Sequence, residues 1–389
     1  MKHRLSNFLK YNKVAYAIYF YIMSFCINFL KLFIKTDDRL ILFNSFAGRK
    51  FDDSPKAIFE AMLTDPRFKD YKFVWAFHQP EEFDIKGAEK IKTDGFQYFK
   101  TALSARVWIT NSSVERGLRF RGKNTFYLNT WHGSPIKKMG SDIASENQSF
   151  GTKSGYRPDV MNTQSLFEAE IFSKCFGIPR NQFIEVGLPR NDVLANYTDE
   201  VRCEIRKKLG ISPEKKVILY CPTFREYDKD ENRGVVLAPP MNLDKWEKML
   251  GDSYVLLFRA HYEVSKVMEV KENEFVRNMT NYPSLSDLMI ASDILVSDYS
   301  SIFFDYSIMD KCMLHFTYDF DKYEKKRGMY FDIRDYLSGA DNEEELIAYL
   351  SKLSYSEEID RTRIFRDKYV NFYGNAARQT ADCIAEHIM

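Results

Sequence analysis

The sequence lacks a charge surplus of either sign. Its 389 residues carry 56 Lys and Arg against 55 Asp and Glu, which gives a formal net charge of +1. A nucleic-acid backbone demands a clear basic surplus, so the composition gives no support for a nucleic-acid partner. Any site for an anion must therefore be local.

The six cysteines lack any pattern. They form no CxxC pair and no Cys/His cluster with the spacing of zinc ligands. We expect them to be reduced, buried thiols in a cytosolic compartment. Internal repeats and low-complexity tracts are also missing. Apolar residues, in contrast, make up 45% of the chain, and its length predicts two domains.

An uncharged segment, residues 14–30, lies near the amino terminus between basic flanks. No small-residue cleavage site follows it, which argues against a signal peptide. It is barely long enough to span a bilayer, and its basic amino-terminal flank would send the rest of the chain away from any nucleotide donor. We therefore expect residues 1–36 to be a membrane-associated helical segment, lying in the interface of the cytoplasmic face. A single span and an ordinary packed helix are the alternatives.

After residue 36, short apolar runs alternate with helical patterns, as is typical of parallel α/β folds. We predict a charged linker helix within 196–213, which separates two series of strands, and helices at 54–63, 95–101, 165–176 and 300–309. The predicted strands are 40–44, 71–76, 107–110, 125–130, 160–163 and 183–186, then 217–221, 254–258, 293–297 and 313–316. The sequence thus predicts two successive α/β domains with a cleft between them, at 37–195 and 196–365, followed by a carboxyl-terminal helix (366–389) that packs back across them.

His132 is the first candidate site residue, because ligands in such sheets bind at the carboxyl ends of strands. It follows the predicted strand 125–130, and Gly133 and Pro135 favour a tight turn there. A histidine is well suited to take a proton from a hydroxyl near neutral pH. A packed or capping histidine is the alternative reading.

Two further candidates could hold an anion. Arg259 and His261 leave the predicted strand 254–258 on one face and offer charge-assisted hydrogen bonds to phosphate oxygens, although an ordinary ion pair would explain them too. Ser300 and Ser301 stand where a helix begins, which is a ready anion site; they could also merely cap that helix.

Weaker signals stand elsewhere. Thr223 and Arg225 follow the strand 217–221 and could reach a donor phosphate or ribose. The acidic pair of Asp319 and Asp321 resembles the DxD of metal-dependent transferases. No other acidic ligand accompanies that pair, so we predict no metal site and no cofactor.

Together these residues resemble the CDP-glycerol glycerophosphotransferase family of teichoic acid synthesis. The resemblance runs from about residue 100 to 380 and rests on NTWHGSPIKKMG, SLFEAEIFSKCFGIPRNQFIEVGLPRNDVL, ILYCPTFRE, LFRAHY, SDILVSDYSSIFFDYSIMDK, HFTYDFDKYEKKRGMYFD and YGNAAR. It implies a GT-B-like pair of Rossmann-type domains, acting without a metal at a cleft between an acceptor-side domain and a CDP-donor-binding domain. It implies that His132 is the base, with His261 also at the catalytic centre. Arg259 and His261, with Ser300 and Ser301, would hold the donor phosphates, and Thr223 and Arg225 would have less defined roles.

The function that follows is transfer of glycerol phosphate from CDP-glycerol to a hydroxyl of an acceptor linked to undecaprenyl diphosphate, with release of CMP. The short chain favours a primase-like or single-addition enzyme, or a relative from a capsule cluster. The alternatives are a CDP-ribitol ribitolphosphotransferase, a GT-B glycosyltransferase that uses a nucleotide sugar, and a non-catalytic membrane scaffold. Intact His132, His261, Ser300 and Ser301 argue against the scaffold.

Overall fold

A computed structural model describes residues 12–144, 157–223, 225, 229–230, 234–235, 240–260 and 270–389. The chain divides into two compact units. Unit 1 comprises Met1–His132, Met139–Asp192 and Phe372–Met389, and unit 2 comprises Gly133–Lys138 and Val193–Asn371. The short segment Gly133–Lys138 belongs to unit 2, although the sequence-based division places all of 37–195 in the first domain.

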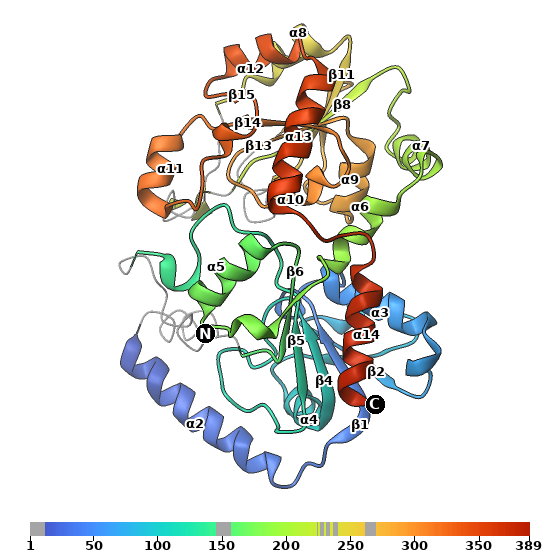
Figure 1. The fold of residues 1–389 in the computed structure, drawn as a ribbon, viewed down its shortest axis with the longest axis vertical. Coiled ribbons are helices and arrows are strands. Elements are labelled where there is room, and N and C mark those ends of the chain that lie inside the picture. The colour runs from blue at the N-terminus through green and yellow to red at the C-terminus, as the bar shows by residue number, and fades with distance from the viewer. Residues whose placement is uncertain are drawn as a thin grey trace. The chain divides into compact units, whose positions relative to one another are not determined.

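Unit 1 is built, within the described residues, on a seven-stranded parallel sheet with the order β3-β2-β1-β4-β5-β6-β7 (Figure 1). Its first six strands follow the 3-2-1-4-5-6 order of Rossmann folds. The bounds are β1 (Asp37–Asn44), β2 (Lys72–Phe77), β3 (Glu89–Lys92), β4 (Ala105–Thr110), β5 (Phe126–Asn129), β6 (Val160–Thr163) and β7 (Phe183–Glu185). In such a sheet the chain reverses direction of winding between β1 and β4, and ligands bind at that switch point.

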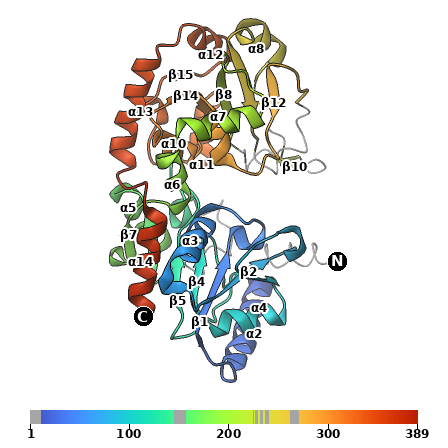
Figure 2. The ribbon, with the colours of Figure 1, turned by 90° about the vertical axis from the view of Figure 1, so that its right-hand side faces the viewer.

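Helices cover both faces of this sheet because its strands alternate apolar side chains between two cores. Phe43, Trp75 and Ile109 pack on one face with the helices α3 (Asp53–Thr64) and α14 (Ala376–Ile388). Leu42 and Trp108 pack on the other face with α2 (Lys13–Lys31) and α4 (Phe96–Ser104). The helix α5 (Leu166–Phe176) packs beside β6 and β7. Of the helices that the structure describes, the first (α2) and the last (α14) thus both belong to unit 1 (Figure 2).

Unit 2 repeats this plan with a six-stranded parallel sheet among its described residues, in the order β12-β11-β8-β13-β14-β15. Counted along this unit the order is again 3-2-1-4-5-6, with its switch point between β8 and β13. The strands are β8 (Lys216–Cys221), β11 (Tyr254–Phe258), β12 (Val276–Asn278), β13 (Ile294–Ser297), β14 (Cys312–Phe316) and β15 (Gly339–Ala340); β9 (Lys229–Asp230) and β10 (Gly234–Val235) form a separate antiparallel pair. The helices are α6 (Asp192–Asn196), α7 (Asp199–Lys208), α8 (Leu243–Leu250), α9 (Leu285–Ala291), α10 (Ile302–Ser307), α11 (Phe320–Arg327), α12 (Glu343–Leu350) and α13 (Tyr355–Tyr369).

Three expectations are corrected. The predicted helix 366–389 is two helices, because α13 ends at Tyr369 in unit 2 and the separate α14 belongs to unit 1, where the Asp192 carboxylate accepts hydrogen bonds from its first amides. The predicted helix 300–309 is shorter at both ends, as α10 shows. All six cysteines are free thiols, but Cys26 and Cys203 are exposed, so burial is not their common property.

Candidate functional site

His132 lies at the switch point of the sheet in unit 1. The loops that leave β1, β4 and β5 meet there, and they bring Phe46, Asn111 and His132 together. The Nδ1 atom of His132 is 2.6 Å from the backbone carbonyl oxygen of Asn111. A carbonyl only accepts hydrogen bonds, so Nδ1 carries the proton. The lone pair of the imidazole is therefore on Nε2, which is the form that a general base needs.

Packing against the surrounding protein favours the neutral form of His132. Burial lowers the pKa of His132 below its usual range, and the Asn111 carbonyl and the carboxylate of Asp53 oppose this shift. Asp53 is itself paired with Arg190 at 3.2 Å, and both side chains are largely buried. The His132 side chain nevertheless keeps access to solvent, so a substrate hydroxyl can reach it.

Two residues whose rings contact this histidine have strained backbones. Trp131 has a φ of 52° and Phe46 one of 47°, values in the left-handed region that side chains with a Cβ rarely adopt. Buried asparagines hold both residues: Asn129 Oδ1 accepts from the Trp131 amide at 2.8 Å, and Asn111 Oδ1 accepts from the Phe46 amide at 2.7 Å. Strain held in this way is typical of sites whose geometry matters more than local stability. The roles of Asn111 and Phe46 could not be predicted from the sequence, because only the sheet order brings their loops to His132.

The residues directly after His132 belong to unit 2. The Lys138 amide donates to the Gly328 carbonyl at 3.0 Å, and the Tyr330 amide donates to the Ile136 carbonyl at 2.8 Å. Gly133 lies so close to Ser301 that a Cβ at this position would be 2.7 Å from the serine Oγ. The motif around His132 therefore continues, within unit 2, against one of the serines that the sequence singled out.

Thr223, Ser300 and Ser301 lie at the switch point of unit 2, after β8 and β13. Ser300 Oγ accepts from the Ile302 amide at 3.3 Å, whereas the Ser301 side chain makes no capping bond to α10. The Thr223 hydroxyl is buried and has no hydrogen-bond partner among the described residues. A buried hydroxyl without a partner is costly, and a ligand phosphate or hydroxyl would satisfy it.

Arg225 does not have the role predicted from the sequence, which was contact with a donor phosphate or ribose. Its guanidinium is 2% exposed and lies between two carboxylates, with Nη2 2.9 Å from Asp298 and both Nε and Nη2 2.8 Å from Asp319. The rings of three tyrosines surround it, each within 5.3 Å of its Cζ atom: Tyr299, Tyr318 and Tyr323. Arg225 is thus a structural residue that ties together the loops after β8, β13 and β14.

The same contacts occupy the carboxylate of Asp319. Its carboxylate takes the two parallel hydrogen bonds from Arg225 and one from the Tyr299 hydroxyl at 3.1 Å. Within the part of the chain that the structure describes, no group of three or more His, Cys, Asp or Glu could hold a metal ion. The ion pair with Arg225 therefore accounts for Asp319, the first carboxylate of the DxD pattern.

Arg259 follows β11, as predicted, and its Nη1 donates to the carbonyls of Met279 at 3.1 Å and Tyr282 at 2.7 Å. These bonds fix the guanidinium at the carboxyl edge of the sheet in unit 2. His261 lies outside the described residues.

Comparisons with known proteins fit this geometry. Residues 26–386 match the model of a family described as CDP-Glycerol:Poly(glycerophosphate) glycerophosphotransferase. The chain is 33% identical over 373 residues to the teichoic acid poly(glycerol phosphate) polymerase of Staphylococcus epidermidis, covering 90% of this chain and 51% of that protein. It therefore spans about half the length of that relative. It is 30% identical over 358 residues to the teichoic acid glycerol-phosphate transferase of Staphylococcus aureus, covering 87% of this chain and 91% of the relative.

A solved structure from the same kind of enzyme is also similar to this chain. The wall teichoic acid polymerase TagF, in a variant form soaked with CDPG, superposes with a TM-score of 0.81 and 31% identity, covering 91% of this chain and 90% of the other. The family model covers both units and every candidate residue, including His132, Thr223 and Ser301. The chain belongs to the CDP-glycerol:poly(glycerophosphate) glycerophosphotransferase family.

Proposed function

We propose that this protein transfers glycerol phosphate from CDP-glycerol to a hydroxyl of a lipid-linked acceptor in teichoic acid or related cell-surface polymer synthesis. The observation that carries the proposal is the His132 imidazole, which keeps its proton on Nδ1 and presents a basic Nε2 at a switch point. Family membership supplies the donor chemistry.

In the proposed reaction, the acceptor hydroxyl gives its proton to Nε2 of His132. Its oxygen attacks the β-phosphorus of CDP-glycerol, to which the glycerol is attached. A new phosphorus–oxygen bond forms, and the bond from this phosphorus to the bridging oxygen breaks. CMP leaves with the bridging oxygen and its electron pair, and the imidazolium returns its proton to solvent.

We assign the donor half of the site to unit 2, the second of two Rossmann-type units of a GT-B-like fold. Hydroxyl donors near the departing charge would be Thr223, Ser300 and Ser301, and the buried Thr223 hydroxyl has an unmet hydrogen bond to offer. Arg259 adds a fixed positive charge at the same sheet edge, and His261 remains a second catalytic candidate. Such stabilisation of developing charge is commonly the largest catalytic contribution.

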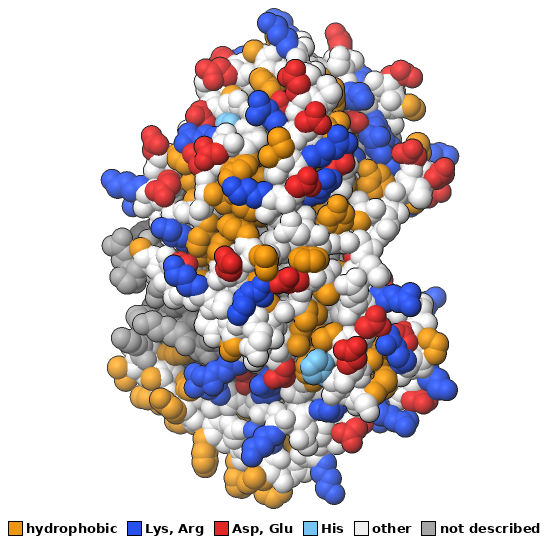
Figure 3. Space-filling model, viewed as in Figure 1, with side chains coloured by type: hydrophobic (Ala, Val, Ile, Leu, Met, Phe, Trp, Pro, Cys, Tyr) orange, Lys and Arg blue, Asp and Glu red, His pale blue; other side chains and the backbone are white. Residues whose placement is uncertain are grey.

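The amino-terminal helix supports a membrane location. Of the described helices, α2 alone is long and apolar enough to cross a membrane, judged by length and composition. One side of α2 is fastened to unit 1, where Ile27 is buried and the Asn28 amide donates to the Arg119 carbonyl at 2.7 Å. The opposite side carries exposed apolar residues at helical spacing along the lower left of Figure 3: Val14, Ile18, Tyr21, Ile22, Phe25, Phe29, Leu32 and Phe33.

A helix fastened on one side and apolar on the other suits a bilayer surface better than a span, because a spanning helix would have to release its polar bonds to the domain. We therefore propose peripheral attachment to the cytoplasmic face of the membrane, where nucleotide donors are available. The acceptor would then be an undecaprenyl-diphosphate-linked saccharide or polymer in the same membrane.

The test is release of CMP from CDP-glycerol with a lipid-linked saccharide acceptor, compared with CDP-ribitol and UDP-sugars, and mass analysis of the product. Replacing His132 by Ala should lower turnover about 10²–10⁴-fold, the usual contribution of a general base, and leave CDP-glycerol binding intact. His78→Ala is the matched control, because His78 is another histidine of unit 1 with one side-chain hydrogen bond. Turnover by His132→Ala equal to that of the control would remove His132 as the base. Turnover with CDP-ribitol or UDP-sugars alone would refute the donor.

A further inference from the structure

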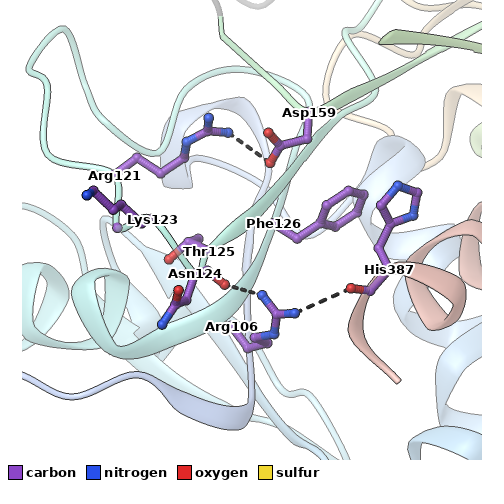
Figure 4. Close-up of a pocket in the computed structure, with 9 residues that line it drawn as sticks. Arg106, Arg121, Lys123, Asn124, Thr125, Phe126, Asp159 and His387 are labelled. Atoms are coloured by element: carbon purple, nitrogen blue, oxygen red, sulfur yellow. Dashed lines mark hydrogen bonds and ion pairs between the residues drawn. The ribbon is translucent and has the colours of Figure 1, made fainter. Parts of the chain in front are cut away.

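A small basic cavity opens at the edge of the unit 1 sheet opposite to His132. It lies where β4 and β5 begin, beside the carboxyl-terminal end of α14 (Figure 4). Arg106, Arg121 and Lys123 supply three positive charges to its wall, and Asp159 is the one carboxylate in that wall. The mechanism above uses none of these residues.

The two arginines of this cavity are held in place by the fold. Arg106 donates to the carbonyls of Asn124 and His387, which bind the start of β5 to α14. Arg121 pairs with Asp159 at 2.9 Å, and that carboxylate also accepts from the Tyr127 amide at 2.8 Å. Lys123 is exposed, on the turn that follows Arg121. Three cations facing one carboxylate that is already engaged leave an excess of positive charge, and an anion would be attracted to it.

The size of the cavity limits the anion. Its volume of about 250 Å³ is below the range of ~300–1,000 Å³ that is usual for drug-sized ligands. A phosphate group with a short polar substituent fits this space better than a nucleotide does. The position agrees, since nucleotides bind at the carboxyl ends of parallel strands and this cavity lies at the amino ends.

The loop that forms the cavity is the loop that fastens α2. Lys31, the last residue of α2, donates from Nζ to the Phe120 and Arg121 carbonyls at 3.3 and 3.1 Å. Asn28, one turn earlier, donates to the Arg119 carbonyl. A bilayer in contact with the apolar side of α2 would therefore have its headgroups near residues 119–125.

We propose that this cavity binds the phosphate of an anionic membrane lipid. The proposal rests on the membrane attachment argued above and adds a chemical selectivity to it: α2 gives contact with any bilayer, and the cavity gives a preference for bilayers with an exposed anionic phosphate. Lys and Arg near such a surface typically strengthen binding by about 1 kcal/mol each, which is roughly fivefold in affinity.

The experiment measures binding of the full-length chain to two kinds of vesicle by sedimentation. One is zwitterionic phosphatidylcholine, and in the other part of this lipid is replaced by phosphatidylglycerol. The cavity variant is Arg106→Gln with Lys123→Gln. The matched control, Lys69→Gln with Lys86→Gln, removes the same charge from exposed residues of unit 1 outside the cavity. A third variant, Phe25→Ser with Phe29→Ser, removes part of the apolar side of α2.

The wild-type chain should bind phosphatidylglycerol vesicles more tightly than phosphatidylcholine vesicles. The cavity variant should lose about 25-fold on the former, by two charges at fivefold each, and little on the latter. An equal loss by the control variant would show diffuse charge attraction and overturn the proposal, as would equal binding of the wild type to both vesicles. Competition by inorganic phosphate at a concentration as low as that of the lipid would show a site for free phosphate, which also overturns it.

Failure of the membrane attachment gives a different pattern. In that case the wild type binds neither kind of vesicle, and the α2 variant is indistinguishable from it. CMP release from CDP-glycerol with a detergent-dispersed acceptor tests the transfer reaction separately. That rate should be the same for the cavity variant and the wild type, because the cavity lies at the opposite edge of the sheet from His132.

Discussion

Replacing Arg225 with methionine should destabilise unit 2 severely, whereas replacing its partner Asp319 with asparagine should cost much less. The reason is the count of buried charges. One guanidinium faces the carboxylates of Asp298 and Asp319, whose side chains are 1% and 16% exposed. The methionine leaves two carboxylates close together with no counter-charge. The asparagine leaves one cation with one anion, which is a neutral pair.

The magnitudes follow from this asymmetry. Removing one partner of a buried ion pair costs about 3–5 kcal/mol, because the other charge is left without compensation. Arg225→Met should reach the upper part of that range, since it strands the fully buried Asp298 and empties a site between three tyrosine rings. Asp319→Asn should cost about 1.5–3 kcal/mol, the worth of a hydrogen bond to a charged group.

Amide hydrogen exchange in urea, followed by mass spectrometry of peptides, measures the loss of stability in each unit separately. A peptide that covers β13 reports on unit 2, and one that covers β4 reports on unit 1 and should not change. Equal losses for Arg225→Met and Asp319→Asn would refute the reasoning from charge count. If β13 in Arg225→Met is as protected from exchange as in the wild type, the ion pairs of Arg225 do not contribute to the stability of unit 2.

Three further outcomes are expected. The acid limb of the pH profile of kcat/KM should lie below pH 6.5, because burial lowers the pKa of His132 and the base works only when it is neutral. Asp53→Asn removes a charge that raises this pKa, so it should move the acid limb to still lower pH. An acid limb that does not move would exclude His132 as its source. Gly133→Ala should lower turnover without loss of thermal stability, because the new Cβ would press on Ser301. Gly95→Ala is the control, since Gly95 has open space around it. Equal turnover by the two variants would contradict a role for the contact between Gly133 and Ser301. Burial lowers the pKa of Lys311 to about 7, so the unfolded chain binds more protons between pH 7 and 10 and the free energy of unfolding should rise with pH there. This rise should vanish in Lys311→Met, which should also lower the free energy of unfolding by about 1–3 kcal/mol because it removes one hydrogen bond from each of three carbonyls. A rise that persists in urea titrations of Lys311→Met would exclude Lys311 as its cause.

The interior of the fold could be read from the sequence because central parallel strands are continuous apolar runs. The ranges 160–163 and 254–258 coincide with β6 and β11, and the other predicted strands differ by three residues or fewer at each end. Three of the four edge strands of the two described sheets, β3, β12 and β15, were missed by this reading, whereas the fourth, β7, was predicted as 183–186. Glu-Lys-Ile-Lys in β3 has one buried residue, and β15 has only two residues, so neither carries an apolar run.

The candidate site divides in the same way. His132 was predictable because its place after a strand is a local property of the chain. The Asn111 carbonyl that fixes its tautomer comes from a loop 21 residues away, and only the sheet order brings it there. Arg225 was misread because its sequence neighbours gave no sign of Asp319, 94 residues later. The acidic and tyrosine-rich stretch around Asp319 is the signal that could have suggested an ion pair.

The path of the chain between the units has a consequence for engineering. The boundary is crossed after His132, Lys138, Asp192 and Asn371, so no single cut separates one unit from the other. A fragment that starts at Val193 lacks the segment that pairs with Gly328 and Tyr330, and one that stops at Asp192 lacks α14 and exposes the apolar face of α3. If unit 2 binds the donor, as proposed above, a chimera that exchanges donor preference between relatives should therefore take 133–138 together with 193–371 from one parent and keep 372–389 with the rest of unit 1 from the other.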